Sequence, residues 1–462
     1  MTRDLHDQLS AYLVERRWFA GKGRQFTVAH VHPLPFLSTE GIRVRVEAVT
    51  IIFEDGTRDT YQVPLAYLEH EEHDLAHAYV GRVDDPELGE AWAYDAVFLK
   101  DAAAQVLEAF RDRRELDGIR FRVLGGAELP EPTDLGTVLS AEQSNTSLAY
   151  GEAAIFKLFR RISAGHNPDI EIHAALTHRG DEHIAPLLGW VEGTWIDAEG
   201  EKHEGDLGML QVFLRTATDG WVMALGSVRD LLVEEDLHPD EVGGDFAAEA
   251  ERLGAATAEI HADLAAAFDT AEMSAPQRDA IVLGMQSRLD AALRSIPELE
   301  PYADRLRHRY QALADLGTPL PIQRVHGDLH LGQTLRTVKG WKIIDFEGEP
   351  AKRLAERVAL DSPVRDVAGM VRSLDYAAGA TLQQFGSDAQ LRYRADEWAQ
   401  RNREAFLSGY AQTSGVELDR LGTVLAAYEA DKAVYEAMYE MRNRPTWLGI
   451  PLHGVARIAG EE

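Results

Sequence analysis

The chain has 462 residues, more than one hydrophobic core usually organises, and is expected to form roughly two or three structural units. Its 47 Lys and Arg against 77 Asp and Glu give a net charge of −30, which argues against nucleic-acid partners, because phosphate backbones are bound by basic surfaces. The lack of cysteine excludes disulfides, thiolate zinc sites and cysteine nucleophiles. The charged N-terminus is unlike a signal peptide and no segment approaches a membrane span, so we expect a cytoplasmic protein with no membrane partner.

Residues 1–90 are predicted to form a small, mostly β module. A short amphipathic helix opens it, and alternating apolar and polar residues at 42–49 and 60–65 predict strands. Trp18 is expected to pack inside this module. The pairs Arg16-Arg17 and Arg160-Arg161 could each touch an anion, but solvated surface positions are the preferred interpretation.

Residues 91–206 mix helix and strand and are predicted to form an α/β nucleotide-binding lobe. Lys157 alternates inward from the apolar strand at 153–159, and a buried ammonium needs phosphates and a carboxylate to offset its charge. The next helix is predicted to start near Pro168, since proline is favoured in the first helical turn. We expect Glu171 on this helix to provide the carboxylate, with Asp169 as the alternative.

Two further segments are expected to contact the nucleotide. Residues 142–147 link two predicted strands without the glycines that usually permit close backbone approach, so Ser144 and Thr146 would bind phosphates through amides and hydroxyls. The apolar strand at 207–214 is placed to contact adenine, with Gln211 and Phe213 as candidates, although a plain core strand is equally consistent with it.

Residues 207–462 are dominated by predicted helices and contain the two aspartate segments described next, so we expect them to form the second lobe of a bilobal, protein-kinase-like α+β fold. Helical spacing of apolar residues is clear at four places, namely residues 247–268, 361–378, 398–410 and 418–441. The nucleotide is expected between the two lobes.

Two segments of this half, residues 325–333 and 343–349, indicate the chemistry. Phosphoryl transfer from ATP needs one aspartate that orients the acceptor hydroxyl and another that holds Mg²⁺ against the phosphates. Asp328 is the candidate for the first role and Asp345 for the second, and their separation of 17 positions allows a loop, a hairpin and a return to the same cleft.

Four neighbouring residues have supporting roles in this prediction. Gln333 stands where kinase-like enzymes commonly use an asparagine metal ligand, with a loop-stabilising hydrogen bond as the alternative, and Glu347 would hold metal-bound water or a substrate hydroxyl. His326 is expected to brace the catalytic loop rather than to transfer protons. Asp366 is expected to accept hydrogen bonds from the backbone of that loop.

The last long helix presents Lys432, Tyr435, Glu436 and Tyr439 at i, i+3, i+4 and i+7, on one face. Such a set suits a sugar, which is held by charged and amide hydrogen bonds and by aromatic rings. A solvated Lys–Glu pair on an exposed helix fits the same spacing.

With these segments assembled, the chain resembles the maltokinases, which are related to aminoglycoside phosphotransferases and eukaryotic-like kinases. The resemblance extends over nearly the full length. Besides the two catalytic segments it includes residues 17–21, 142–147, 157–161, 167–169, 242–246, 361–369, 431–436 and 444–445.

The resemblance implies ATP- and Mg²⁺-dependent phosphorylation of maltose to maltose 1-phosphate for α-glucan or glycogen synthesis. It further implies an N-terminal cap on the smaller lobe, a sugar site that adds Arg442 to the helix face above, and association with an enzyme that converts trehalose into maltose. Kinases of glucosamine or of an aminoglycoside remain alternatives, although Lys432 and Arg442 would oppose a cationic acceptor. A nucleotide-binding pseudokinase would lack Lys157 or one of the aspartates, and all are present.

Overall fold

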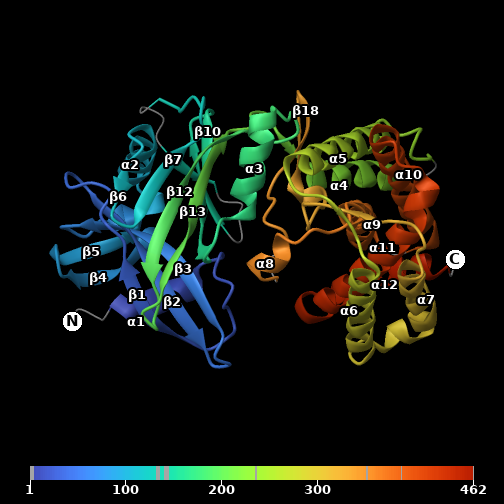
Figure 1. Ribbon diagram of the computed structural model, residues 1–462, viewed down its shortest axis with the longest axis horizontal. Helices are drawn as coiled ribbons and strands as arrows, with labels where there is room; N and C mark the ends of the chain where they lie inside the picture. Colours follow the sequence, from blue (N-terminus) through green and yellow to red (C-terminus); the bar gives the residue numbers. More distant parts are fainter. Residues whose placement is uncertain are drawn as a thin grey trace. The chain divides into compact units, whose positions relative to one another are not determined.

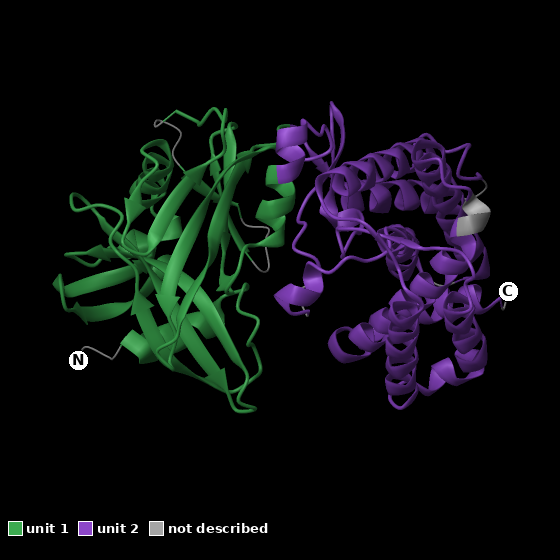
Figure 2. Ribbon diagram, viewed as in Figure 1, with its two compact units in different colours: residues 1–174, 185–215 green, residues 175–184, 216–462 purple. Residues whose placement is uncertain are grey.

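The computed structural model describes residues 5–131, 136–139, 145–234, 237–349, 352–386 and 388–460, and it divides into two compact units (Figure 2). The first unit comprises residues 1–174 and 185–215, and the second comprises residues 175–184 and 216–462. The first is rich in strands and the second in helices (Figure 1), which confirms the predicted α+β class. No helix of the described residues is long and apolar enough to cross a membrane.

The N-terminal part of the first unit is an antiparallel sheet in the order β1-β2-β3-β5-β4, with helix α1 packed on it. Both strands that were predicted here, β2 and β3, are present, and Trp18 is buried as expected. Their inward residues, among them Val49, Ile51 and Val63, form a core with the apolar face of α1. The elements are α1 (Leu5–Glu15), β1 (Phe26–Pro33), β2 (Arg43–Phe53), β3 (Arg58–Leu68), η1 (His73–Ala78), β4 (Tyr79–Asp85), β5 (Gly89–Asp95) and η2 (Ala96–Phe98).

A second, seven-stranded sheet completes the first unit, in the order β6-β7-β12-β13-β10-β9-β8. The predicted strand around Lys157 is β10, and the predicted domain boundary at 206 falls inside β13. The elements that follow η2 in the chain are α2 (Lys100–Arg111), β6 (Glu115–Leu116), β7 (Ile119–Val123), β8 (Gly136–Leu139), β9 (Asn145–Tyr150), β10 (Ala154–Phe159), β11 (Arg161–Ile162, which belongs to the N-terminal sheet), α3 (Pro168–Arg179, which continues into the second unit), β12 (Leu187–Ile196) and β13 (Lys202–Val212).

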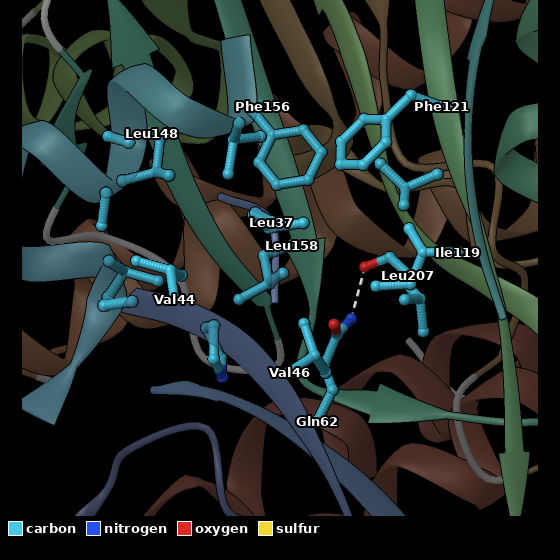
Figure 3. Close-up of a pocket in the computed structure, with 17 residues that line it drawn as sticks. Leu37, Val44, Val46, Gln62, Ile119, Phe121, Leu148, Phe156, Leu158 and Leu207 are labelled. Atoms are coloured by element: carbon cyan, nitrogen blue, oxygen red, sulfur yellow. Dashed lines mark hydrogen bonds between the residues drawn. The ribbon is translucent and has the colours of Figure 1, made fainter. Parts of the chain in front are cut away.

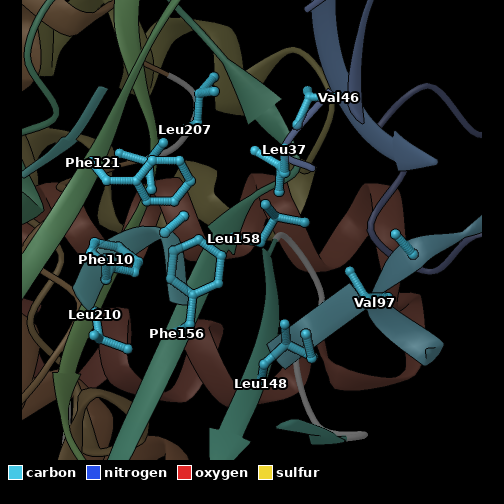
Figure 4. Close-up of a cluster of buried hydrophobic side chains, with 14 of the residues drawn as sticks. Leu37, Val46, Val97, Phe110, Phe121, Leu148, Phe156, Leu158, Leu207 and Leu210 are labelled. Atoms are coloured by element: carbon cyan, nitrogen blue, oxygen red, sulfur yellow. The ribbon is translucent and has the colours of Figure 1, made fainter. Parts of the chain in front are cut away.

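The two sheets of the first unit share one hydrophobic core. Val46 of the N-terminal sheet, together with Leu37, belongs to the same buried cluster as Phe156 and Leu158 of β10 (Figure 4). Strand β11 pairs with β3, so the main chain also joins the two sheets. A small apolar cavity of about 50 Å³ remains at this junction (Figure 3). The module predicted for residues 1–90 is therefore packed into the lobe that follows it.

Two polar side chains cross the same junction. The Gln62 amide donates to the Leu207 carbonyl oxygen (Figure 3). It also donates to the Phe159 carbonyl oxygen, at 2.6 Å. Arg160 is only 1% exposed, and its Nη2 donates to Asp95 Oδ2 at 2.8 Å. The surface position expected for Arg160 is thus wrong, because a buried carboxylate 65 residues earlier in the chain neutralises it. Arg161, its neighbour, is exposed and pairs with Asp59.

The described residues of the second unit form a set of packed helices with a small three-stranded sheet, in the order β14-β17-β18, and one strand pair, β15-β16. All four helices predicted by spacing are present, although the one expected from residue 361 begins only after Pro363. Helices α5 and α10 approach closely at Gly254 and Gly409, where a Cβ would lie 2.0 Å from a backbone oxygen of the other helix. The elements are β14 (Thr218–Asp219), α4 (Gly220–Val233), α5 (Ala247–Ala267), β15 (Ala271–Glu272), α6 (Ala275–Leu293), η3 (Pro297–Tyr302), α7 (Ala303–Ala314), β16 (Pro321–Ile322), η4 (Leu331–Gln333), β17 (Thr334–Thr337), β18 (Gly340–Ile343), α8 (Leu354–Arg357), α9 (Val364–Phe385), α10 (Ala389–Ser414), α11 (Leu418–Asn443), η5 (Pro445–Trp447) and α12 (Gly449–Ala459).

Candidate active site

The loop that contains Asp328 precedes the β17–β18 hairpin in the chain, and the loop that contains Asp345 follows it. Both loops therefore adjoin the open end of the hairpin, where Thr334 pairs with Ile343. The first loop leaves β16 and reaches Asp328, and the hairpin then returns the chain to Asp345. The loops touch through their backbones at Gly327, where a Cβ would lie 3.4 Å from the Cα of Gly348. Both glycines have positive φ, of 86° and 71°, a conformation that favours glycine.

His326 and Asp366 hold the first loop in place. Asp366, which is 1% exposed, accepts hydrogen bonds from the backbone N–H groups of His326 and Gly327, each at 2.8 Å. The His326 ring accepts from the Asp328 N–H through Nδ1 (3.3 Å), so its Nε2–H donates to the Ile344 carbonyl at 3.0 Å. One histidine ring therefore connects the two loops. Burial would raise the pKa of Asp366, but hydrogen bonding and charge from His261 hold it below its ordinary value.

Gln333 and Asp345 lie side by side at the base of the hairpin. The Gln333 side chain donates through Nε2 to Asp345 Oδ2 at 3.0 Å, and the Gln333 backbone carbonyl accepts from the Ile344 N–H at 3.0 Å. Asp345 has a φ of 68°, which is uncommon outside glycine and is a conformation found at functional loops. An amide oxygen and a carboxylate are hard donors of the kind that Mg²⁺ prefers. Glu347 follows two residues later, and its carbonyl accepts from Arg357 at 3.2 Å.

A polar pocket of about 420 Å³ within the second unit has Asp328 in its wall. Asp328 Oδ1 accepts a hydrogen bond from Lys432 Nζ of α11 at 3.0 Å. Burial alone would raise the pKa of Asp328, but the ammonium of Lys432 outweighs it and holds the pKa below its ordinary value. The carboxylate is therefore ionised at neutral pH.

The other charges of this lining also form ion pairs. Glu349 pairs with both Lys352 (3.1 Å) and Arg365 (3.0 Å). Arg365 reaches Asp361 as well, at 3.0 Å. Arg288 of α6 pairs with Asp431 of α11. Each cation of the lining thus has a carboxylate partner in the same lining.

Helix α11 brings two of its five predicted site residues into this pocket. Lys432 and Tyr435 line it, whereas Glu436, Tyr439 and Arg442 are not among the lining residues. Glu436 accepts two hydrogen bonds from the fully buried guanidinium of Arg372, at 2.8 and 3.0 Å. A buried cation of this kind requires a carboxylate partner, which explains why the Glu436 side chain contacts Arg372 and does not line the pocket. Tyr439 is 46% exposed beneath Arg444, and Arg442 is exposed one turn further on.

Lys157 of the first unit forms its ion pair with Asp169 at 2.9 Å. We expected Glu171 to be the partner, but the structure assigns that contact to Asp169, which is 1% exposed at the start of α3. His173, one turn later, also contacts Asp169 at 3.0 Å. Burial would raise the pKa of Asp169, but the charges of Lys157 and His173 hold it far below its ordinary value.

Two of the remaining candidates for nucleotide contact, Thr146 and Gln211, lie on the sheet that carries Lys157. Thr146 is on β9, and its hydroxyl accepts from Arg160 Nε at 2.8 Å. Gln211 is near the end of β13, and its amide donates to the Ala185 carbonyl at 3.4 Å. Phe213 follows the strand, with its N–H bonded to the Ala153 carbonyl at 3.0 Å. Ser144 lies outside the described residues.

Sequence reasoning missed several residues of the polar pocket. Glu349 ends the segment that begins at Asp345, and Arg365 directly precedes Asp366, so both were adjacent to predicted residues. Asp431 likewise precedes Lys432. Arg288 gave no signal, because its relation to the pocket depends on how α6 packs against α11.

Family models match two regions of the chain. Residues 12–98 match the maltokinase N-terminal cap domain, and residues 225–414 match the phosphotransferase enzyme family. The second match includes Asp328, Asp345 and Asp366 but ends before α11.

Curated relatives and solved structures agree with these matches. A glucosamine kinase from Streptacidiphilus jiangxiensis is 31% identical to this chain, in an alignment that covers 76% of this chain and 75% of that kinase. A glucosamine kinase from Mycolicibacterium smegmatis is 27% identical, in an alignment that covers 68% of this chain and 77% of that kinase. A solved glucosamine kinase (crystal form B) has a TM-score of 0.68 at 24% identity, covering 94% of each chain. Another, in complex with glucosamine, ADP and inorganic phosphate, has a TM-score of 0.67 at 24% identity over 99% of this chain and 100% of that one. The predicted kinase-like fold with an N-terminal β-rich cap is confirmed.

Proposed function

Because this chain belongs to the phosphotransferase enzyme family, in the group that carries a maltokinase N-terminal cap domain, we propose that it transfers a phosphoryl group from ATP to the anomeric hydroxyl of maltose. The product would be maltose 1-phosphate, a precursor for α-glucan synthesis. The observation that carries the proposal is the ionised Asp328 in the wall of a polar pocket, hydrogen-bonded to Lys432 at 3.0 Å.

In this proposal Asp328 accepts a hydrogen bond from the acceptor hydroxyl and aims its oxygen at the γ-phosphorus. Such enzymes act mainly by positioning and by stabilising charge, so a carboxylate in a fixed orientation is the main requirement. The bonds from Asp366 to the backbone of His326 and Gly327 fix the loop, and Lys432 fixes the side chain. As the hydroxyl loses its proton, Asp328 receives it.

Gln333 and Asp345 would hold Mg²⁺, since their side chains supply an amide oxygen and carboxylate oxygens, which are hard donors, and lie side by side at the base of one hairpin, with Gln333 Nε2 3.0 Å from Asp345 Oδ2. When bound, the ion neutralises the charge of the nucleotide phosphates. Lys157, which pairs with Asp169 at 2.9 Å, stays a prediction for phosphate contact. Thr146, Gln211, Phe213 and Glu171 stay predictions for nucleotide contact.

The charge balance of the acceptor pocket favours a neutral sugar. Each of its cations is paired with a carboxylate, so the lining can donate and accept hydrogen bonds without a strong excess of either charge. Tyr435 adds an aromatic surface beside Lys432, whose Nζ lies 5.7 Å from the ring centre. A volume of about 420 Å³ is within the range of small-molecule sites. Glu347, Glu436, Tyr439 and Arg442 stay predictions for sugar contact.

Glucosamine is the second candidate acceptor, and it is favoured because both curated relatives are glucosamine kinases. An ammonium group would need a carboxylate of the lining. Glu349 is one such carboxylate, and it is already shared by Lys352 and Arg365.

The test is ADP release from Mg-ATP with maltose, glucose, glucosamine, trehalose and kanamycin, with Asp328→Asn as the inactive control. Turnover with maltose, and a product without a reducing end, is expected. Turnover only with glucosamine or kanamycin would overturn the acceptor and keep the catalytic residues. Release of ADP by Asp328→Asn at the rate of the native enzyme would overturn the role of Asp328.

A further inference from the structure

The cap side of the first unit contains a second large pocket, of about 490 Å³, whose lining carries four cations and one carboxylate. The cations are Arg16, Arg17, Lys100 and Arg160, and the carboxylate is Glu15. This concentration of positive charge is unusual in a chain with a net charge of −30. The pocket shares no lining residue with the one at Asp328 and belongs entirely to the first unit.

Arg160 is the residue that indicates a ligand. Its Nε and Nη2 are bonded to Thr146 and Asp95, and the guanidinium stacks on Trp18 at 4.5 Å. Its buried Nη1 has no hydrogen-bond partner among the described residues. An unmade bond of a buried, charged donor is costly, so an acceptor from outside the chain would stabilise this group.

Two further cations of the pocket are available to an anion. Arg17 and Lys100 are exposed and form no ion pair with the described part of the chain. Lys100 is also the first residue of α2, a helix of 12 residues whose N-cap, Leu99, supplies no side-chain hydrogen bond. An uncapped helix N-terminus attracts anions through its free N–H groups and its dipole.

We propose that this pocket binds a phosphate monoester, with the phosphate among Arg17, Lys100 and Arg160. Arg17 could contact two phosphate oxygens through its guanidinium, Arg160 could donate through Nη1, and the Lys100 ammonium could contact the third oxygen. The apolar wall of Phe98, Val138 and other residues would accommodate the organic part.

Occupancy of this pocket would act on the strand that carries Lys157. Arg160 already holds the Thr146 hydroxyl of β9, and β9 pairs with β10 so that Ser147 lies opposite Lys157. A ligand that fixes Arg160 would reduce the freedom of this strand pair. We expect bound phosphate monoester to change the KM for ATP.

The experiment is calorimetric titration with glucose 1-phosphate and, separately, with inorganic phosphate. We expect saturable binding that is weakened about tenfold or more in the double variant Arg17→Ala/Lys100→Ala. The matched control, Lys22→Ala/Lys202→Ala, removes two exposed cations of the same unit outside the pocket and should bind as the native protein does. Lys157→Ala should also bind normally, because its lysine belongs to the candidate nucleotide site. Tighter binding of glucose 1-phosphate than of inorganic phosphate would identify an ester as the ligand, and equal binding would identify free phosphate.

Three results would overturn the proposal. They are absence of saturable binding to the native protein, normal binding to Arg17→Ala/Lys100→Ala, and loss of binding in Lys157→Ala. The two substituted cations are exposed, so unchanged melting temperatures are expected and would exclude unfolding as a cause.

Discussion

The ion pair between Asp328 and Lys432 determines the charge of the carboxylate that faces the polar pocket. Lys432 opposes the effect of burial, so the pKa of Asp328 lies below its ordinary value. A carboxylate that acts as a base is active above its pKa and loses activity as the pH falls through it. The native enzyme should therefore stay active well into the acidic range until it unfolds.

Replacing Lys432 by Met keeps the apolar stem but removes the charge. Burial should then raise the pKa of Asp328, and the acid limb of the kcat profile should move up by about one to three pH units. The acceptor KM should rise, because a hydrogen-bond donor of the pocket is lost, while the KM for ATP stays close to native. Lys352→Met is the matched control, since Lys352 pairs with Glu349 in the same lining. If the acid limb of the kcat–pH profile stayed at the same pH in Lys432→Met, Lys432 could not be the group that lowers the pKa of Asp328.

Replacing Asp328 by Asn should lower kcat by about 10²- to 10⁴-fold and leave ATP affinity nearly unchanged. The amide keeps the shape of the side chain but cannot accept the hydroxyl proton. Glu356→Gln provides the comparison, because Glu356 is an exposed carboxylate of the same pocket and glutamine preserves its capping contact at the start of α8. Equal kcat values for the two variants would exclude Asp328 as the group that orients the acceptor.

Strands β10 and β11 connect the two sheets of the first unit, and adjacent arginines at their junction have opposite surroundings. Arg160 is buried against Asp95, whereas the Arg161 side chain is 55% exposed beside Asp59. Arg160→Met should destabilise the protein by about 3–5 kcal/mol, because Asp95 is left buried without its cation. Arg161→Met should cost about 0.5 kcal/mol or less. Urea unfolding of both variants measures the difference, and similar midpoints would contradict a stabilising role for the buried pair.

Patterns within one element were predictable, and partners from distant elements were not. Spacing alone located β10, α5 and α11, and the proline at 168 marked the start of α3. The choice of Asp169 over Glu171 depends on side-chain directions in the first turn of α3. The burial of Arg160 depends on Asp95, and the turn of Glu436 away from the pocket depends on Arg372. Local periodicity contains no information about such long-range pairs.

The shared core of the first unit makes the cap part of the lobe rather than an appendage. Leu37 and Val46 from the cap pack in one cluster with Phe156 and Leu158. Removal of the cap would expose this apolar surface to water at a cost of roughly 25 cal/mol per Å².

A comparison of two fragments tests this coupling. Residues 1–215 should unfold cooperatively, whereas residues 99–215, which lack the cap, should bind hydrophobic dyes and show no cooperative transition. The reason is that the second fragment keeps only one wall of the common core. A sharp thermal transition in the shorter fragment would show that the lobe folds without its cap.

The left-handed backbone at Asp345 restricts which side chains that position tolerates. With a φ of 68°, only glycine, asparagine and aspartate fit there at little cost. Asparagine would therefore preserve the loop while removing the negative charge. Asp345→Asn is accordingly the replacement of choice for trapping an unreacted complex of both substrates in crystals, because a larger residue would distort the loop that the trap is meant to preserve.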